Sequence, residues 1–349
     1  MPDAWNDPER LPDRAPSQGT DAIAMGVATG VGSLPGTDIG EAVNIVFGEL
    51  PEWPHLPELP DRGLGSDMIG RGAALLEGLP VQWWAFRWEL ADLPGRDARR
   101  AADFLERDLD ALHEVTTAGP VRLNAVGPFT LAANLWRRTG GAMLADPGAV
   151  ADLTASLAEG LRNYVAAAQA RMPKAALSIQ LDEPSLPAAL AGRVNTESGL
   201  DFYRRVPVEV ARERLRELTE QVGVPVVVHC CAPDVPVKLL EEAGAQALSI
   251  DLTLFNLDDV PKVDALGEYL DGGGRLIAGV VPALGKPHPG IAKEAAERVL
   301  GLWNRLGFNP ELLPQRVSVA TTCGMAGASP DYARFAMEAS REAAERLRG

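Results

Sequence analysis

The chain has 349 residues, of which 46% are hydrophobic and 23% charged, a balance typical of a globular protein rather than a disordered or fibrous one. Its formal net charge of −15 argues against a nucleic-acid partner, because such binding depends on Lys and Arg side chains that neutralise phosphates. No apolar run approaches the ~20 residues that cross a bilayer, so we expect no membrane partner.

Short apolar runs alternate with amphipathic segments along most of the chain. Residues 1–21, rich in Pro, Asp and Arg, are predicted to be a disordered or loosely attached tail, and residues 22–349 a single domain. Gly, Pro or Asp flanks each apolar run, as is usual for buried parallel strands. We predict strands at Ala24–Val31, Val121–Val126, Ala176–Leu181, Val224–Val228, Ala247–Leu252, Leu276–Val281 and Val317–Ala320. We predict helices at Ile39–Glu49, Asp97–Thr117, Pro147–Arg171, Pro207–Val222, Val235–Ala243, Pro289–Leu306 and Pro330–Arg348.

This alternation of strands and helices is typical of a mostly parallel sheet covered by helices. With these seven runs and a weaker eighth candidate near Val81–Arg87, the pattern favours an α/β fold, a closed (β/α)8 TIM barrel. An open, doubly wound sheet is the alternative. It is disfavoured because no GxGxxG turn follows the first strand.

Reactive side chains gather where the predicted strands end, which is where a barrel of this kind carries its active site. The chain has only three cysteines, and two of them fall in this layer. So few thiols make no disulfide framework and indicate a reducing, cytoplasmic compartment in which cysteines are free for metal binding or catalysis. The strand-end residues are Ser33, Asp182, Glu183, His229, Cys231, Asp251 and Cys323.

The strand that ends in VVVHCC carries the strongest metal-binding signal. Successive strand side chains point to opposite faces, so His229 and Cys231 share a face that Cys230 does not. Asp251 ends the next strand and Cys323 the last. One nitrogen, one oxygen and two sulfurs make a plausible tetrahedral Zn²⁺ shell. The alternative is that these cysteines are small buried residues with no ligand.

The motifs GVGSLPG, IQLDEP, H-x-C and a final TTCGM, in this order, resemble the catalytic half of cobalamin-independent methionine synthase, over roughly Gly26 to Arg341. The resemblance implies a single C-terminal-type barrel that transfers a methyl group to the thiolate of homocysteine. It implies zinc on His229, Cys231 and Cys323, with Asp251 standing where the family has a glutamate. It also implies a homocysteine site, for which we expect Gly32, Ser33, Asp182 and Glu183 to bind the substrate.

The sequence departs from the family pattern in two places: at the end of the seventh strand, which concerns the methyl donor, and in the second βα region. The seventh strand end reads IAGVVPALGKP and lacks the family's histidine, so His288, a few residues later, is the candidate catalytic acid. The glutamate of the second βα region has no clear match, and Glu58 and Asp67 are the candidates. The methyl donor is thus either methyl-folate or a methyl-corrinoid protein, and we expect the corrinoid to be the better donor because it needs no acid.

Two other functions stay open at this level. A uroporphyrinogen decarboxylase-type barrel enzyme would need basic residues at the mouth, whereas the strand ends here are mostly acidic or thiol. A non-catalytic homologue that binds zinc or a corrinoid would keep the fold without the reaction.

Overall fold

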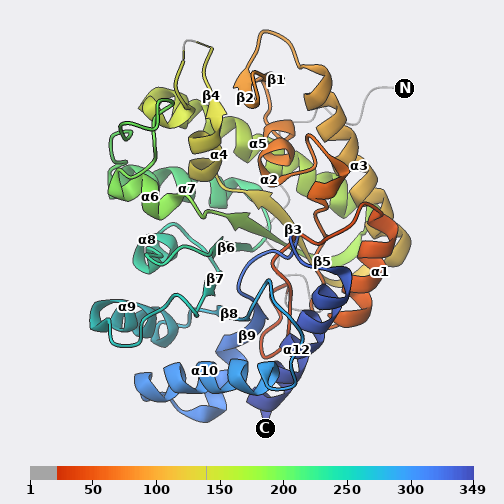
Figure 1. The fold of residues 1–349 in the computed structure, drawn as a ribbon, viewed down its shortest axis with the longest axis vertical. Coiled ribbons are helices and arrows are strands. Elements are labelled where there is room, and N and C mark those ends of the chain that lie inside the picture. The colour runs from red at the N-terminus through yellow and green to blue at the C-terminus, as the bar shows by residue number, and fades with distance from the viewer. Residues whose placement is uncertain (1–21, 139) are drawn as a thin grey trace.

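Six parallel strands form the main sheet, in the order β3-β5-β6-β7-β8-β9 (Figure 1). The structure is a computed structural model that describes residues 22–138 and 140–349, so the predicted tail at residues 1–21 lies outside the described residues. All five strand pairings in this sheet are parallel. The strands are β3 (Ala118–Val126), β5 (Lys174–Asp182), β6 (Val226–Cys230), β7 (Ala247–Asp251), β8 (Leu276–Val281) and β9 (Val317–Thr321).

Two irregular segments close this sheet into a barrel. The first, around Ala28, lies parallel to β9, where the Thr29 N–H donates to the Val319 carbonyl at 2.9 Å. The second, residues 54–58, lies parallel to β3 through His55 and joins the first segment through a bridge between Ser33 and Glu58. Together with the six regular strands they make eight, so the (β/α)8 prediction is confirmed, with its first two strands reduced to short bridges.

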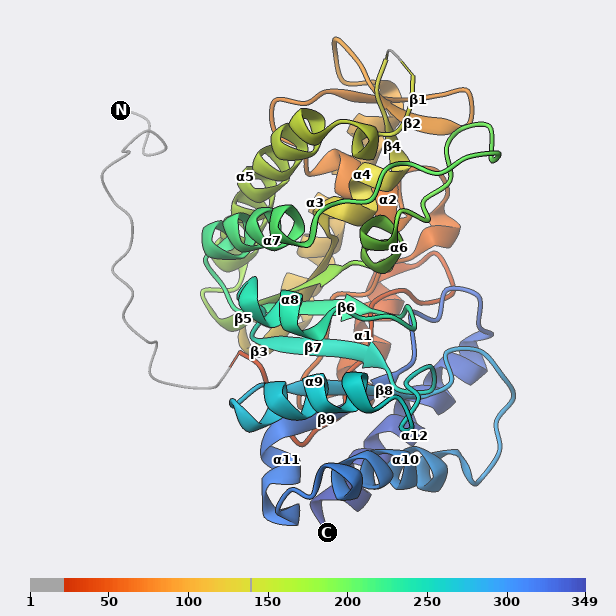
Figure 2. The ribbon, with the colours of Figure 1, turned by 90° about the vertical axis from the view of Figure 1, so that its left-hand side faces the viewer.

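The segment suspected as the eighth strand lies elsewhere. Strands β1 (Val81–Trp84) and β2 (Arg87–Leu90) form an antiparallel hairpin, which pairs with β4 (Leu135–Trp136) in a separate small sheet. Both views place this sheet at the end of the molecule opposite α10 (Figures 1 and 2). The sequence does not predict a strand at residues 54–58, because Pro54 and Pro57 lack the N–H groups that a strand uses in its hydrogen bonds to a neighbour.

Helices surround the barrel and follow the strands in sequence (Figure 2). The seven predicted helices are present with ends shifted by a few residues. The described residues also form five α-helices that the sequence does not predict, the longest of them Val260–Asp271 with 12 residues. The helices are α1 (Ile39–Glu49), α2 (Met68–Ala74), α3 (Arg96–Val115), α4 (Pro128–Asn134), α5 (Pro147–Arg171), α6 (Leu186–Ala191), α7 (Val208–Val222), α8 (Val237–Glu242), α9 (Val260–Asp271), α10 (Ile291–Leu306), α11 (Leu313–Arg316) and α12 (Pro330–Arg348), with 3-10 turns η1 (Pro60–Arg62), η2 (Met143–Ala145) and η3 (Pro310–Leu312). None of the described helices is long and apolar enough to cross a membrane.

Two hydrophobic clusters fill the molecule. The larger contains the buried residues of the helices together with strand residues such as Val226, Val228 and Leu248. The smaller contains Val227, Ala247, Ile277 and Ala320 from four neighbouring strands, with Ile23, Val27 and Trp53. Because side chains alternate along a strand, His229 and Ser249 lie on the same strand faces as Val227 and Ala247, two residues nearer the carboxyl ends. The apolar layer is therefore followed by a polar layer at the mouth.

Candidate metal centre

Three predicted ligands meet at the carboxyl ends of the strands. His229 lies in β6, Cys231 directly follows that strand, and Cys323 follows β9. One imidazole nitrogen and the two sulfurs lie within 4.8 Å of one another, and the Sγ atoms are 3.5 Å apart. Two thiolates bound tetrahedrally to zinc at ~2.3 Å would lie about 3.8 Å apart. The donor types and their spacing therefore fit zinc.

The imidazole of His229 is held in the orientation that a metal ligand needs. Its Nδ1 lies 3.0 Å from the Ser249 hydroxyl in the neighbouring strand β7. Its Nε2 is buried and has no hydrogen-bond partner among the described residues. A buried nitrogen without a partner is costly unless something binds it. Nε2 is therefore the atom available to a metal, and Ser249 fixes the ring by its other nitrogen.

The two thiols of the centre are electrostatically unequal. The hydrogen bond between the sulfurs lowers the pKa of Cys323, and the neighbouring His229 lowers it further. The same contact, together with burial, raises the pKa of Cys231. Of the two thiols, Cys323 therefore forms a thiolate more readily than Cys231. A thiolate is the form of cysteine that binds metals.

Cys230 differs from both in position and chemistry. Its side chain is fully buried, and burial raises its pKa to about 12. It does not belong to the close group of ligand atoms, as the alternation of side chains along β6 predicts. Its surroundings are those of an inert core thiol.

Asp251, the predicted fourth ligand, lies outside the close group. Strand register explains its position. His229 pairs with Ser249, and Asp251 lies two residues farther along β7, opposite Gly279. Its Oδ1 accepts hydrogen bonds from the N–H and the hydroxyl of Thr253, at 2.8 and 2.5 Å. Metal binding by Asp251 stays a prediction that requires its carboxylate to leave this turn.

Ser33 lies directly against the loop that carries Cys323. The Met325 N–H donates to the Ser33 carbonyl at 2.7 Å. A Cβ atom on Gly324 would lie 2.1 Å from the Ser33 hydroxyl, so a larger residue after Cys323 would displace that hydroxyl. The neighbouring Gly32 accepts a backbone hydrogen bond from Glu58. The turn at Gly32 and Ser33 therefore borders the metal centre.

Asp182 places a buried carboxylate next to the metal ligands. It ends β5 in register with His229, and its Oδ1 accepts a hydrogen bond from Gln180 at 2.8 Å. Burial raises its pKa to about 7, against the opposing influence of nearby His229 and Arg122. A cation bound beside this carboxylate would favour its charged form.

Glu183 has a different environment from its neighbour Asp182. Its carboxylate accepts hydrogen bonds from the N–H groups of Phe129 and Thr130 and from the Thr130 hydroxyl, at 2.7 to 2.8 Å. The side chain is fully buried, and burial raises its pKa to about 7. Strand alternation turns it away from Asp182 and under the first turn of α4. The carboxylate of Glu183 therefore anchors α4, and substrate binding by Asp182 and Glu183 stays a prediction.

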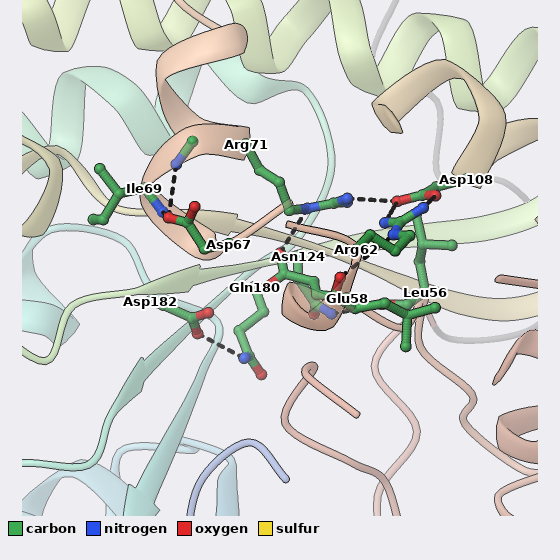
Figure 3. Close-up of polar contacts among 12 residues, drawn as sticks. Leu56, Glu58, Arg62, Asp67, Ile69, Arg71, Asp108, Asn124, Gln180 and Asp182 are labelled. Atoms are coloured by element: carbon green, nitrogen blue, oxygen red, sulfur yellow. Dashed lines mark hydrogen bonds and ion pairs between the residues drawn. The ribbon is translucent and has the colours of Figure 1, made fainter. Parts of the chain in front are cut away.

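The structure also separates the two candidates in the second βα region. Asp67 caps α2, where its Oδ1 accepts from the N–H groups of Ile69 and Gly70 (Figure 3). Glu58 instead ends the second barrel segment beside Gly32, and its charge acts on the pKa of Asp182. Its side chain bonds to Arg71, a residue that no sequence motif singled out.

His288 lies in the loop just before α10 and outside the group of close ligand atoms. Its Nδ1 accepts from the Gly290 N–H at 3.3 Å, and its Nε2 lies 3.9 Å from the Glu294 carboxylate. Half of its side chain is exposed. The described contacts of His288 are thus local to α10, and its catalytic role stays a prediction.

Comparison with known protein families gives a match over most of the chain. The family described as "Cobalamin-independent synthase, Catalytic domain" matches residues 97–346. Comparison with curated proteins gives no match.

Two solved structures share the fold. A B12-independent methionine synthase from Shewanella sp. W3-18-1, in complex with selenomethionine, has a TM-score of 0.58 at 12% identity and covers 93% of this chain and 98% of its own. A methyltransferase from Methanosarcina mazei has a TM-score of 0.55 at 14% identity, covering 92% and 94%.

Proposed function

The chain belongs to the family of cobalamin-independent synthase catalytic domains, and on that premise we propose that it transfers a methyl group directly to the thiolate of homocysteine, with zinc as its metal. The observation that carries the proposal is the meeting of His229, Cys231 and Cys323 next to Asp182 and Ser33. When bound, zinc would hold the acceptor thiol as a thiolate, the nucleophilic form of a thiol.

The remaining residues of the mouth would bind the amino-acid part of the acceptor. Asp182 would pair with its ammonium group, since this buried carboxylate borders the ligands and has few partners of its own. The turn at Gly32 and Ser33 would donate hydrogen bonds to its carboxylate. Ser249 would keep the His229 ring directed at the metal. These contacts would place the sulfur of the acceptor at the metal in a fixed orientation.

Metal analysis combined with a methylation assay tests the proposal. We expect one zinc per chain in the purified protein, and methionine formation from homocysteine that stops when a chelator removes the metal. Cys323→Ser should lose both properties. Zinc-loaded protein that fails to methylate homocysteine with either donor would overturn the proposal and favour the non-catalytic homologue. The decarboxylase alternative has no support here, because Asp182 and Glu58 bring acidic rather than basic groups to the mouth.

For the methyl donor, we propose a methyl-corrinoid rather than methyl-folate. Transfer from methyl-folate requires a positioned acid, and the candidate acid His288 is half exposed and contacts the N-terminal end of α10. A corrinoid leaves as a reduced metal centre and needs no such acid. We expect methylcobalamin to give faster turnover than 5-methyltetrahydrofolate. Faster turnover with the folate, abolished by His288→Ala, would overturn this choice of donor.

A further inference from the structure

A buried chain of four alternating charges leads from helix α3 to the mouth of the barrel (Figure 3). Arg62 donates two hydrogen bonds to Asp108, at 2.5 and 2.9 Å. The second oxygen that accepts from Arg62 also accepts from Arg71 at 2.5 Å, and the Nε of Arg71 donates to Glu58 at 3.1 Å. The side chains of Asp108 and Arg71 are 0% and 2% exposed. Two positive and two negative groups balance, as a buried ionic cluster requires.

Helix α2 is packed closely enough to bring Arg71 to Glu58. Arg71 stands between two glycines, Gly70 and Gly72. A Cβ on Gly72 would lie 2.1 Å from Val126 Cγ1, and one on Gly70 would lie 2.5 Å from the Gly65 Cα. No larger residue fits at either position without moving the helix. The two glycines therefore allow the approach that places the guanidinium against Glu58.

Glu58 is the member of the cluster that reaches the mouth. Its N–H donates to the Gly32 carbonyl at 3.2 Å, and Leu34, next to Ser33, donates back to its carbonyl at 2.9 Å. Arg71 holds one carboxylate oxygen, and the other has no hydrogen bond among the described residues. Burial raises the pKa of Glu58, Arg71 lowers it, and the negative charge of Asp108 raises it again. Arg71 thus favours both the charge and the orientation of this carboxylate.

We propose that Arg71 and Asp108 are positioning residues that hold the Glu58 carboxylate in a fixed orientation beside the Gly32–Ser33 turn, so that the acceptor pocket selects thiols that carry an ammonium group. This inference rests on the proposed function, because it takes homocysteine as the acceptor. Asp108 acts through Arg71, since it fixes the far side of the guanidinium whose near side binds Glu58. Arg62 in turn neutralises Asp108.

Two thiols that differ only in the ammonium group provide the test. The affinity of zinc-loaded protein is measured by calorimetry for L-homocysteine and for 4-sulfanylbutanoate, which keeps the thiol and carboxylate but has no amine. Asp108→Asn preserves shape and removes charge, and Arg71→Lys keeps charge but loses the two-sided contact. Each should weaken homocysteine binding roughly tenfold or more, as expected for a disturbed charged hydrogen bond, and leave 4-sulfanylbutanoate binding and zinc content unchanged.

Arg162→Met is the matched control, because it removes an arginine whose ion pair with Glu159 is largely exposed. It should change neither affinity. If Asp108→Asn and Arg71→Lys weaken the binding of both thiols equally, or if both variants lose cooperative melting, the cluster only supports the fold and the inference is overturned. Wild-type protein that binds zinc but not homocysteine would overturn the proposed function instead.

Discussion

The contact between Ser249 and His229 allows the metal centre to be weakened without touching a ligand. The Ser249 hydroxyl lies 3.0 Å from Nδ1, and the side chain of His229 is 3% exposed. Ser249→Ala would leave Nδ1 without its partner in a place that water does not readily reach. The ring could then rotate away from the orientation that directs Nε2 at the metal.

The expected loss of zinc affinity follows from the role of residues that hydrogen-bond to a metal-binding histidine. Removing the partner of a ligating histidine typically lowers metal affinity by about 10- to 100-fold, which is roughly 1.4–2.7 kcal/mol. We expect a value near the upper end, because the buried ring has no other described partner at Nδ1. The overall fold should survive, since the substitution removes one hydroxyl from β7 and adds nothing.

Competition for zinc against a chromophoric chelator measures this affinity directly. Ser340→Ala is the control: that serine is also fully buried, but its hydroxyl donates to the Ala336 carbonyl within α12. It should leave zinc affinity unchanged. An affinity of Ser249→Ala within about twofold of wild type, or an equal loss in Ser340→Ala, would refute the role of Ser249 in orienting His229 for the metal.

Three further outcomes are expected. Cys231→Ser should abolish stoichiometric zinc binding in metal analysis, whereas Cys230→Ser should retain it, because Cys230 lies in the core; zinc loss in Cys230→Ser would mean that the other thiol is the ligand. Asp182→Asn should weaken homocysteine binding by roughly tenfold or more in calorimetry while zinc stays bound, since it removes a charge and not a ligand; equal affinities would exclude Asp182 from the pocket. Burial raises the pKa of Glu183 from 4.5 to about 7, so its stabilising contribution is complete below pH 4.5 and is lost as the pH rises through 7. In urea unfolding, Glu183→Gln should therefore flatten the fall in unfolding free energy between these pH values, and an unchanged slope would contradict the assigned pKa.

The regular part of the barrel was predictable from the sequence because buried strands and amphipathic helices leave local patterns. The runs at Val121–Val126, Ala176–Leu181, Ala247–Leu252 and Leu276–Val281 correspond to β3, β5, β7 and β8. The metal candidates followed from the same pattern. Parallel strands end at one edge, so reactive residues at strand ends such as His229 and Cys323 meet although 94 positions separate them in sequence.

Local sequence patterns therefore reveal the order of strands and helices, the layer of reactive residues at the strand ends and the difference between Cys230 and Cys231. The tertiary structure alone decided three further features: that residues 54–58 complete the barrel, that Ser249 orients His229, and that Arg71 connects Asp108 to Glu58. Each of these depends on contacts between segments with no shared local pattern. In sequence, Arg71 and Asp108 look like ordinary charged helix residues. Only packing shows that the glycines beside Arg71 bring its helix close enough to bury both charges.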